Sequence, residues 1–132
     1  MRGAGIILLN SENKVLLILR DNKTSIPYPN MWDVPGGQIE EGETPDEAIR
    51  REMMEELGIK DLGKIELFNI YRSDNLTDYL FWKKINLDVN EIDLQEGQDI
   101  KYFKLGQIRI TKLAFNYNTV LEEFYNEIVK NV

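Results

Sequence analysis

Three features of the 132-residue sequence predict an α+β fold, a mixed β-sheet with helices on both of its faces. Short apolar runs separated by polar turns indicate β-strands in the first twenty residues and again between residues 64 and 105. A helix with clear start and stop signals follows Gly42, and a second amphipathic pattern covers residues 117–131. One sheet flanked by these two helices accounts for that order, and the length suits a single domain over residues 1–132.

The first third of the chain alternates between apolar runs and polar connections. Residues 3–9 (GAGIILL) and 14–20 (KVLLILR) flank the polar residues 10–13, so we predict a β-hairpin, with a longer loop as the alternative. Residues 21–31 contain two prolines and two asparagines, and we expect a surface loop there that could border a pocket. Residues 32–34 form a short extended segment that ends at a proline and two glycines.

The helix after Gly42 has unusually clear boundary signals. Thr44 suits the N-cap, Pro45 suits the first helical position, and Glu47 completes a Thr-x-x-Glu capping box. Gly58 marks the end, because glycine readily adopts the left-handed conformation that closes a helix.

The second half of the chain predicts further strands and a last helix. Residues 64–72 and 78–88 are rich in β-branched and aromatic residues and read as a second hairpin. Residues 90–99 form a polar, acidic loop, and residues 100–105 a short strand. Residues 117–131 place apolar side chains at helical spacing, so this amphipathic helix should pack on the sheet.

The composition excludes several classes of function. Sixteen basic and 23 acidic residues give a net charge of −7, which argues against long nucleic acid as a partner. A small phosphorylated substrate remains compatible if metal ions supply positive charge. The chain has no histidine and no cysteine, so a general base must be a carboxylate, lysine, tyrosine or metal-activated water. The apolar run near the N-terminus is too short for a signal peptide or a membrane span, so a cytoplasmic location is expected.

Three glutamates share one side of the first helix. At 100° per residue, Glu52, Glu55 and Glu56 fall within an arc of about 100° beside the apolar stripe. A solvated acidic face is the simpler reading of such a run. Like charges four residues apart nevertheless cost stability, and the helical wheel places Arg50 and Arg51 away from the centre of the arc. A site for Mg²⁺, Mn²⁺ or Ca²⁺, which prefer oxygen ligands, is therefore the alternative to the solvated face.

The wider pattern decides between these alternatives. The sequence GGQIEEGETPDEAIRREMMEELGI at residues 36–59 resembles the Nudix box without a departure. The positions that carry the resemblance are Gly37, Glu43, Arg51, Glu52, Glu55, Glu56 and Gly58. The resemblance implies a small, MutT-like Nudix hydrolase with an α/β/α sandwich, which would cleave a nucleoside diphosphate linked to another group.

The resemblance also implies a metal site. Glu52, Glu55 and Glu56 would be the catalytic metal ligands for Mg²⁺, with Mn²⁺ possible, and the carbonyl of Gly36 would add a ligand. Glu52 or Glu56 would orient or deprotonate the attacking water. A further carboxylate often comes from a late loop in this family. Glu96 is the candidate here, with Asp99 as the fallback and a plain loop acid as the alternative.

The resemblance implies structural roles for four other positions of the box. Arg51 and Glu43 would form a salt bridge that ties the loop to the helix. Gly37 and Gly58 would serve backbone geometry, one in the loop and one at the helix end.

The substrate lies outside the box. By size and by elimination, we expect a nucleoside triphosphate or an oxidised purine nucleotide, released as the monophosphate and pyrophosphate. Another substrate of the family, such as ADP-ribose, a nucleotide sugar or a dinucleoside polyphosphate, is the alternative, as is a non-catalytic nucleotide-binding module. We expect a monomer or homodimer. The candidate substrate-binding residues are Arg20, Tyr28, Phe81, Trp82, Asn116 and Asn118, although Phe81 and Trp82 point to opposite faces of a strand and the asparagines could cap a helix.

Overall fold

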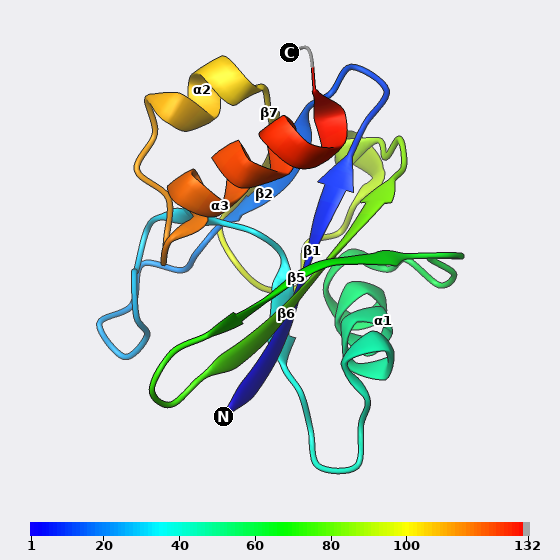
Figure 1. Ribbon diagram of the computed structural model, residues 1–132, viewed down its shortest axis with the longest axis vertical. Coiled ribbons are helices and arrows are strands. Elements are labelled where there is room, and N and C mark those ends of the chain that lie inside the picture. Colours follow the sequence, from blue (N-terminus) through cyan, green and yellow to red (C-terminus); the bar gives the residue numbers. More distant parts are fainter. Residues whose placement is uncertain (131–132) are drawn as a thin grey trace.

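A mixed β-sheet forms the centre of the computed structural model, which describes residues 1–130 (Figure 1). Its strands are β1 (Arg2–Leu9), β2 (Val15–Leu19), β3 (Trp32–Asp33), β4 (Gly36–Gln38), β5 (Glu66–Arg72), β6 (Thr77–Lys84) and β7 (Asp99–Phe103). The strand order is β3-β2-β1-β6-β5, with β4 added to β1 and β7 added to β2. The predicted strand at 78–88 is shorter than expected, because the ladder with β1 ends at Lys84.

Strand β1 is the strand around which the sheet is organised. It runs parallel to β6 along its full length, from Arg2 opposite Thr77 to Leu9 opposite Lys84. Its start also pairs with β4, and it meets β2 only beside the turn, where Leu9 lies opposite Val15. Both strands of the predicted first hairpin are therefore present, but they form almost no hydrogen-bonded ladder with each other. The reason is competition, since β4 pairs with the edge of β1 that faces β2, and β3 pairs with the edge of β2 that faces β1.

Within residues 1–130, five helical segments accompany the sheet. Helix α1 spans Pro45–Leu57 with the predicted capping box, and its C-cap Gly58 has φ 71°. A 3₁₀ turn covers Val89–Glu91. Helix α2, Leu105–Arg109, was not predicted from the sequence, and it ends the expected strand at 100–105 after Phe103. Helix α3, Tyr117–Phe124, continues into a π-helical turn at Tyr125–Val129 in place of one regular helix, and the last predicted helical residue, 131, lies outside the described part.

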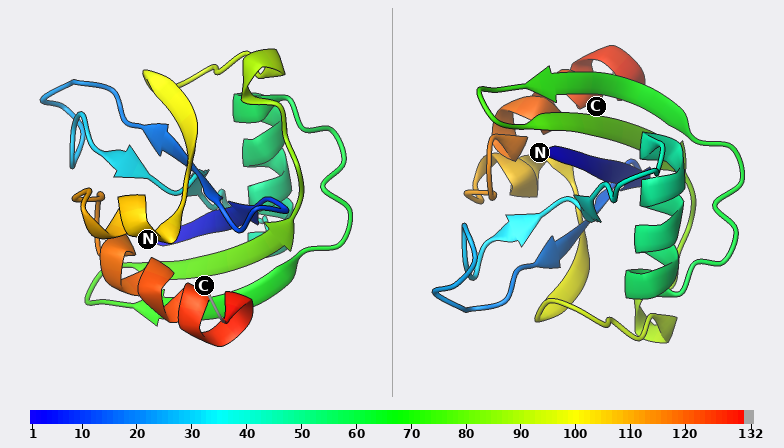
Figure 2. Two further views of the ribbon diagram at one scale, coloured as in Figure 1. Left: turned by 90° about the horizontal axis from the view of Figure 1, so that it is seen from above. Right: turned by 90° about the horizontal axis from the view of Figure 1, so that it is seen from below.

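The two faces of the sheet carry separate cores. Successive residues of β1 alternate between them, so that Ile6 packs under α1 while Ile7 packs under α3. Figure 2 shows α1 on one side of the strands and α3 on the other, which confirms the sandwich expected from the sequence. Among residues 1–130, no helix is long and apolar enough to cross a membrane.

Candidate functional site

Glycines in β4 bring the glutamate-bearing helix against the sheet. A Cβ atom at Gly37 would lie 2.4 Å from the Glu52 carboxylate, so any larger residue would push that side chain away. A Cβ atom at Gly36 would lie 2.2 Å from the Ala4 carbonyl oxygen on β1. The role of Gly37 therefore differs from the predicted one: it makes room for a side chain, whereas the positive φ expected of a backbone role is found at Gly58.

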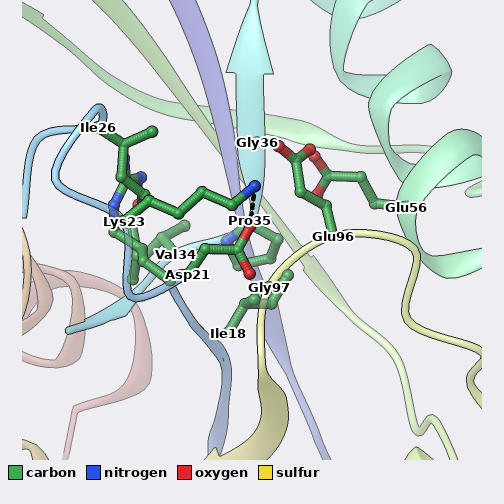
Figure 3. Close-up of a pocket in the computed structure, with 12 residues that line it drawn as sticks. Ile18, Asp21, Lys23, Ile26, Val34, Pro35, Gly36, Glu56, Glu96 and Gly97 are labelled. Carbon is green, nitrogen blue, oxygen red and sulfur yellow. Dashed lines mark hydrogen bonds and ion pairs between the residues drawn. The ribbon is translucent and has the colours of Figure 1, made fainter. Parts of the chain in front are cut away.

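The three helix glutamates and Glu96 open onto one polar recess. Glu52, Glu55, Glu56 and Glu96 line this recess of about 500 Å³. Figure 3 shows the carboxylates of Glu56 and Glu96 side by side near the start of β4. The structure thus brings the candidate loop carboxylate to the helix, whereas the fallback, Asp99, is exposed and lines none of the cavities described here.

Two backbone hydrogen bonds hold the loop that carries Glu96. The Gln95 N–H donates to the Glu56 carbonyl at 3.2 Å, which joins the loop to the last turn of α1. The Gln98 N–H donates to the Leu19 carbonyl at 2.8 Å, which joins it to the end of β2. Glu96 lies between these two anchors, so its position is set by tertiary contacts on both sides.

The crowding of carboxylates perturbs Glu56. Burial raises the pKa of Glu56 well above its usual range, and the neighbouring carboxylates of Glu52 and Glu96 raise it further. Within residues 1–130, no three acidic side chains are arranged to enclose an ion by themselves. Mg²⁺ commonly uses only one or two carboxylates and completes its shell with waters and substrate phosphate oxygens. The carboxylate-rich recess therefore fits a divalent cation that is shared with a phosphate ligand.

Arg51 links the loop before α1 to the acidic cluster. Its Nε and Nη2 atoms donate to Glu43 at 2.7 and 2.9 Å, the salt bridge expected from the sequence, and this lowers the pKa of Glu43 to about 2. Its Nη1 atom also reaches Glu52 at 3.0 Å and Glu55 at 3.3 Å. The wheel argument that Arg51 leaves the cluster unneutralised was wrong, because a wheel places the Cα atom and ignores the length of the side chain. Glu56 has no such contact with Arg51 among the described ion pairs.

A smaller cavity of about 170 Å³ adjoins the glutamates under the loop at residues 21–31. Glu56 and Glu96 form one wall, and Arg20 and Lys23 contribute to the rest. Lys23 extends from the loop toward the centre and lies 3.7 Å from Asp21 (Figure 3). Lys23 was missed at the sequence level, because one lysine in a polar loop carries no distinctive pattern.

A large cavity, about 720 Å³, lies on the other side of β4 from α1 and is lined by residues from six separate stretches of the chain. The rings of Tyr28 and Phe115 form one wall, with centroids 4.6 Å apart. The Arg20 guanidinium lies 5.4 Å from the Phe115 ring centre and donates from Nη1 to Asp33 Oδ2 at 2.9 Å. Arg20 and Asp33 line both this cavity and the smaller one, so they mark the passage between the two.

The structure sorts the candidate substrate-binding residues into two groups. Arg20, Tyr28 and Asn116 line the large cavity. Phe81 and Trp82 do not: Phe81 is buried in the core under α1, and Trp82 packs against Phe124 in the opposite core.

Asn118 also lies away from the cavities. Its amide donates to the carbonyls of Ile108 and Thr111 and accepts from the Leu113 N–H, so it braces the segment before α3. Phe115, Tyr117, Asp33 and Asp78 line the large cavity and were not identified from the sequence. The sequence offered one signal for these lining residues: Asp33 is a carboxylate that directly precedes the run Val-Pro-Gly-Gly.

Comparison with known proteins gives one family. The model of the NUDIX domain matches residues 1–124. The chain is 32% identical over 123 residues to a protein of Methanocaldococcus jannaschii named ADP-ribose pyrophosphatase, covering 89% of this chain and 69% of that protein. It is 29% identical over 127 residues to a Bacillus subtilis protein named putative 8-oxo-dGTP diphosphatase, covering 95% of this chain and 80% of that protein.

Solved structures share the fold. A MutT protein from Methanosarcina mazei Go1 superimposes with a TM-score of 0.79 at 22% identity, covering 96% of this chain and 94% of that one. The NUDIX domain of Shewanella oneidensis NrtR, complexed with ADP ribose, gives a TM-score of 0.80 at 19% identity, covering 97% and 88% of the two chains.

Proposed function

Because this chain belongs to the Nudix family of pyrophosphohydrolases, we propose that it hydrolyses a nucleoside triphosphate or an oxidised purine nucleotide to the monophosphate and pyrophosphate. The observation that carries this proposal is the adjacency of two sites. A recess that contains four glutamates lies beside a cavity large enough for a nucleoside, and Arg20 and Asp33 lie between them. A nucleotide with its base in the cavity would extend its phosphates toward the glutamates.

The residues that would hold the cofactor are Glu52, Glu55, Glu56 and the carbonyl of Gly36, with Glu96 beside them. A bound Mg²⁺ or Mn²⁺ would neutralise the diphosphate and lower the pKa of the attacking water.

The other charged side chains then have separate tasks. Arg51 is committed to Glu43, Glu52 and Glu55, so it orients ligands and is not free to bind substrate. Glu52 and Glu56 are the candidates to orient or deprotonate the attacking water, and of these Glu56 forms no ion pair with Arg51 within residues 1–130. Arg20 and Lys23 are the cations placed to meet phosphate oxygens.

One observation favours a second substrate. The relative that is 32% identical over most of this chain is named for ADP-ribose, whose cleavage would give AMP and ribose 5-phosphate. The same carboxylates would serve that reaction, and nucleotide sugars or dinucleoside polyphosphates would use them in the same way. A binding module without catalysis is disfavoured by the presence of all three helix glutamates.

A substrate panel with product identification separates these functions. Nucleoside triphosphates, 8-oxo-dGTP, ADP-ribose and a dinucleoside polyphosphate are each incubated with Mg²⁺, and the products are resolved by chromatography. Pyrophosphate from a triphosphate supports the first proposal, and ribose 5-phosphate from ADP-ribose supports the second. Bound but uncleaved nucleotide throughout would show a binding module.

A further inference from the structure

The large cavity contains a carboxylate that accepts a hydrogen bond at one oxygen, and no residue from 1 to 130 donates to the other. Asp78 lies near the start of β6, opposite Gly3 of β1. The Tyr117 hydroxyl donates to Asp78 Oδ2 at 3.3 Å, and burial raises the pKa of that hydroxyl well above 10, so it stays protonated as a donor. A Cβ atom at Gly3 would lie 3.0 Å from Asp78 Oδ1, so the glycine leaves space for this oxygen. Among the described residues, no lysine or arginine forms an ion pair with Asp78.

A second carboxylate makes this end of the cavity rich in acceptors. Asp33 is only 9% exposed, and its Oδ2 atom forms an ion pair with Arg20. Its Oδ1 atom is buried and has no hydrogen-bond partner within residues 1–130. An N–H donor would be stabilised at these two oxygens, whereas a lone pair that faces them would be repelled.

The aromatic wall of the cavity suits a flat ring. Tyr28 and Phe115 are each more than 40% exposed, at 42% and 44%, although both are large and apolar. Both also have positive φ angles, 50° and 55°, which cost non-glycine residues of the order of 1 kcal/mol each. Strained, exposed aromatic residues at a cavity are typical of a surface kept for a planar ligand.

We propose that Asp78 is a specificity-determining residue whose carboxylate accepts N–H groups from the base of the substrate, so that the enzyme prefers guanine-type bases. The proposal rests on the nucleotide function given above and names its substrate class. Guanine presents N1–H and a 2-amino group side by side, and Asp78 can accept both, one at Oδ1 and one at the acceptor site of Oδ2 that the Tyr117 hydroxyl leaves open. Hypoxanthine has N1–H alone, and adenine presents a lone pair at N1 that a carboxylate repels.

Binding of monophosphates tests this preference without hydrolysis, because GMP, IMP and AMP have no phosphoanhydride bond. Isothermal titration calorimetry, with and without Mg²⁺, should show GMP binding at least about tenfold more tightly than IMP, and AMP more weakly still, because a hydrogen bond to a charged group is worth this much. In Asp78→Asn, the ratio of GMP to IMP affinity should fall below about threefold. Asp74→Asn, a change of the same charge at an exposed turn of the same hairpin, should keep the wild-type ratio.

The wild-type ranking is decisive even if a variant fails to fold. Equal affinities for GMP and IMP, or tighter binding of AMP, would overturn the assignment and favour an adenine nucleotide such as ADP-ribose. Gly3→Ala gives a second variant, because its Cβ atom would displace the Asp78 carboxylate and should also reduce the ratio. If no nucleotide in the panel is cleaved but the GMP preference depends on Asp78, the proposed hydrolysis fails and the base preference stands.

Discussion

The polar recess and the large cavity differ in how their side chains are placed. Three of the five acids that line the recess come from one helix within five residues, and Arg51 from the same helix braces two of them. The cavity takes its lining from the start of β1, the loop before β3, strands β3 and β4, the β5–β6 hairpin, and the start of α3 with the residues before it. Figure 2 shows these segments converging from distant parts of the chain.

That difference suggests a division of labour. A cluster built on one helix can be preserved as a unit, because its geometry depends on local periodicity. A cavity built from several segments can change one wall without disturbing the others, which is how related enzymes with one chemistry come to act on different substrates. Changes in the recess should therefore affect turnover, and changes in the cavity should affect which ligand binds.

The largest expected effect is loss of turnover in the recess. Glu56→Gln removes the crowded carboxylate, and kcat should fall by about 10²–10³-fold, as expected for loss of a catalytic base or metal ligand. Since burial and like charges already disfavour the ionised Glu56, thermal stability without added metal should not fall. Glu41→Gln, at an exposed position in the loop before α1, should behave as wild type. Retained turnover in Glu56→Gln would remove this residue from the mechanism.

The next effect concerns pH and the cavity carboxylate Asp33. Burial raises its pKa from 3.8 to about 6, despite the hydrogen bond and charge of Arg20. A carboxyl whose pKa is higher in the folded chain contributes stability that is present below pH 3.8 and lost as the pH rises through about 6. Relative to Asp33→Asn, the wild type should therefore lose about 3 kcal/mol of unfolding free energy across that window.

Urea denaturation at several pH values measures this difference. Asp74→Asn, which removes an exposed carboxylate, serves as the control and should follow the wild-type curve. If the unfolding free energy of wild type and of Asp33→Asn depends on pH in the same way over the whole range, Arg20 compensates fully for the burial of Asp33.

A smaller effect on stability is expected at the brace of the recess. Arg51→Ala breaks the paired hydrogen bonds to Glu43 and a further bond to the Gln38 carbonyl, so unfolding should become easier by about 2 kcal/mol. Arg50→Ala on the same helix removes only an exposed pair with Asp46 and should cost less than about 1 kcal/mol. Thermal melts of the two variants side by side give the comparison. Equal melting temperatures, with turnover lost only in Arg51→Ala, would assign Arg51 to catalysis instead.

The smallest expected effect is selective and lies in the cavity. Phe115→Ala removes one half of the aromatic wall, so KM should rise about tenfold while kcat changes little. Ile110→Ala removes a similarly apolar but 86% exposed side chain outside the cavity and should leave both constants unchanged. A fall in kcat with unchanged KM would contradict the division between the two regions.

The sequence by itself determined α1 and its three glutamates. The Thr44–Glu47 capping box, the closing Gly58 and the spacing of the carboxylates depend on interactions within about four residues, and such local rules can be read from one segment. The salt bridge of Arg51 with Glu43 followed from the resemblance of the box.

Only the tertiary structure decided what surrounds that helix. Glu96 reaches the cluster through backbone hydrogen bonds to α1 and β2, and the sequence does not encode that contact in any local pattern. The cavity is assembled in the same way, since Asp33, Asp78 and Phe115 come from segments whose approach depends on how β1 divides its edges among β2, β4 and β6. Strand pairing over such separations is set by the whole sheet, which is why α1 and its glutamates were readable from the sequence and the pocket beside them was not.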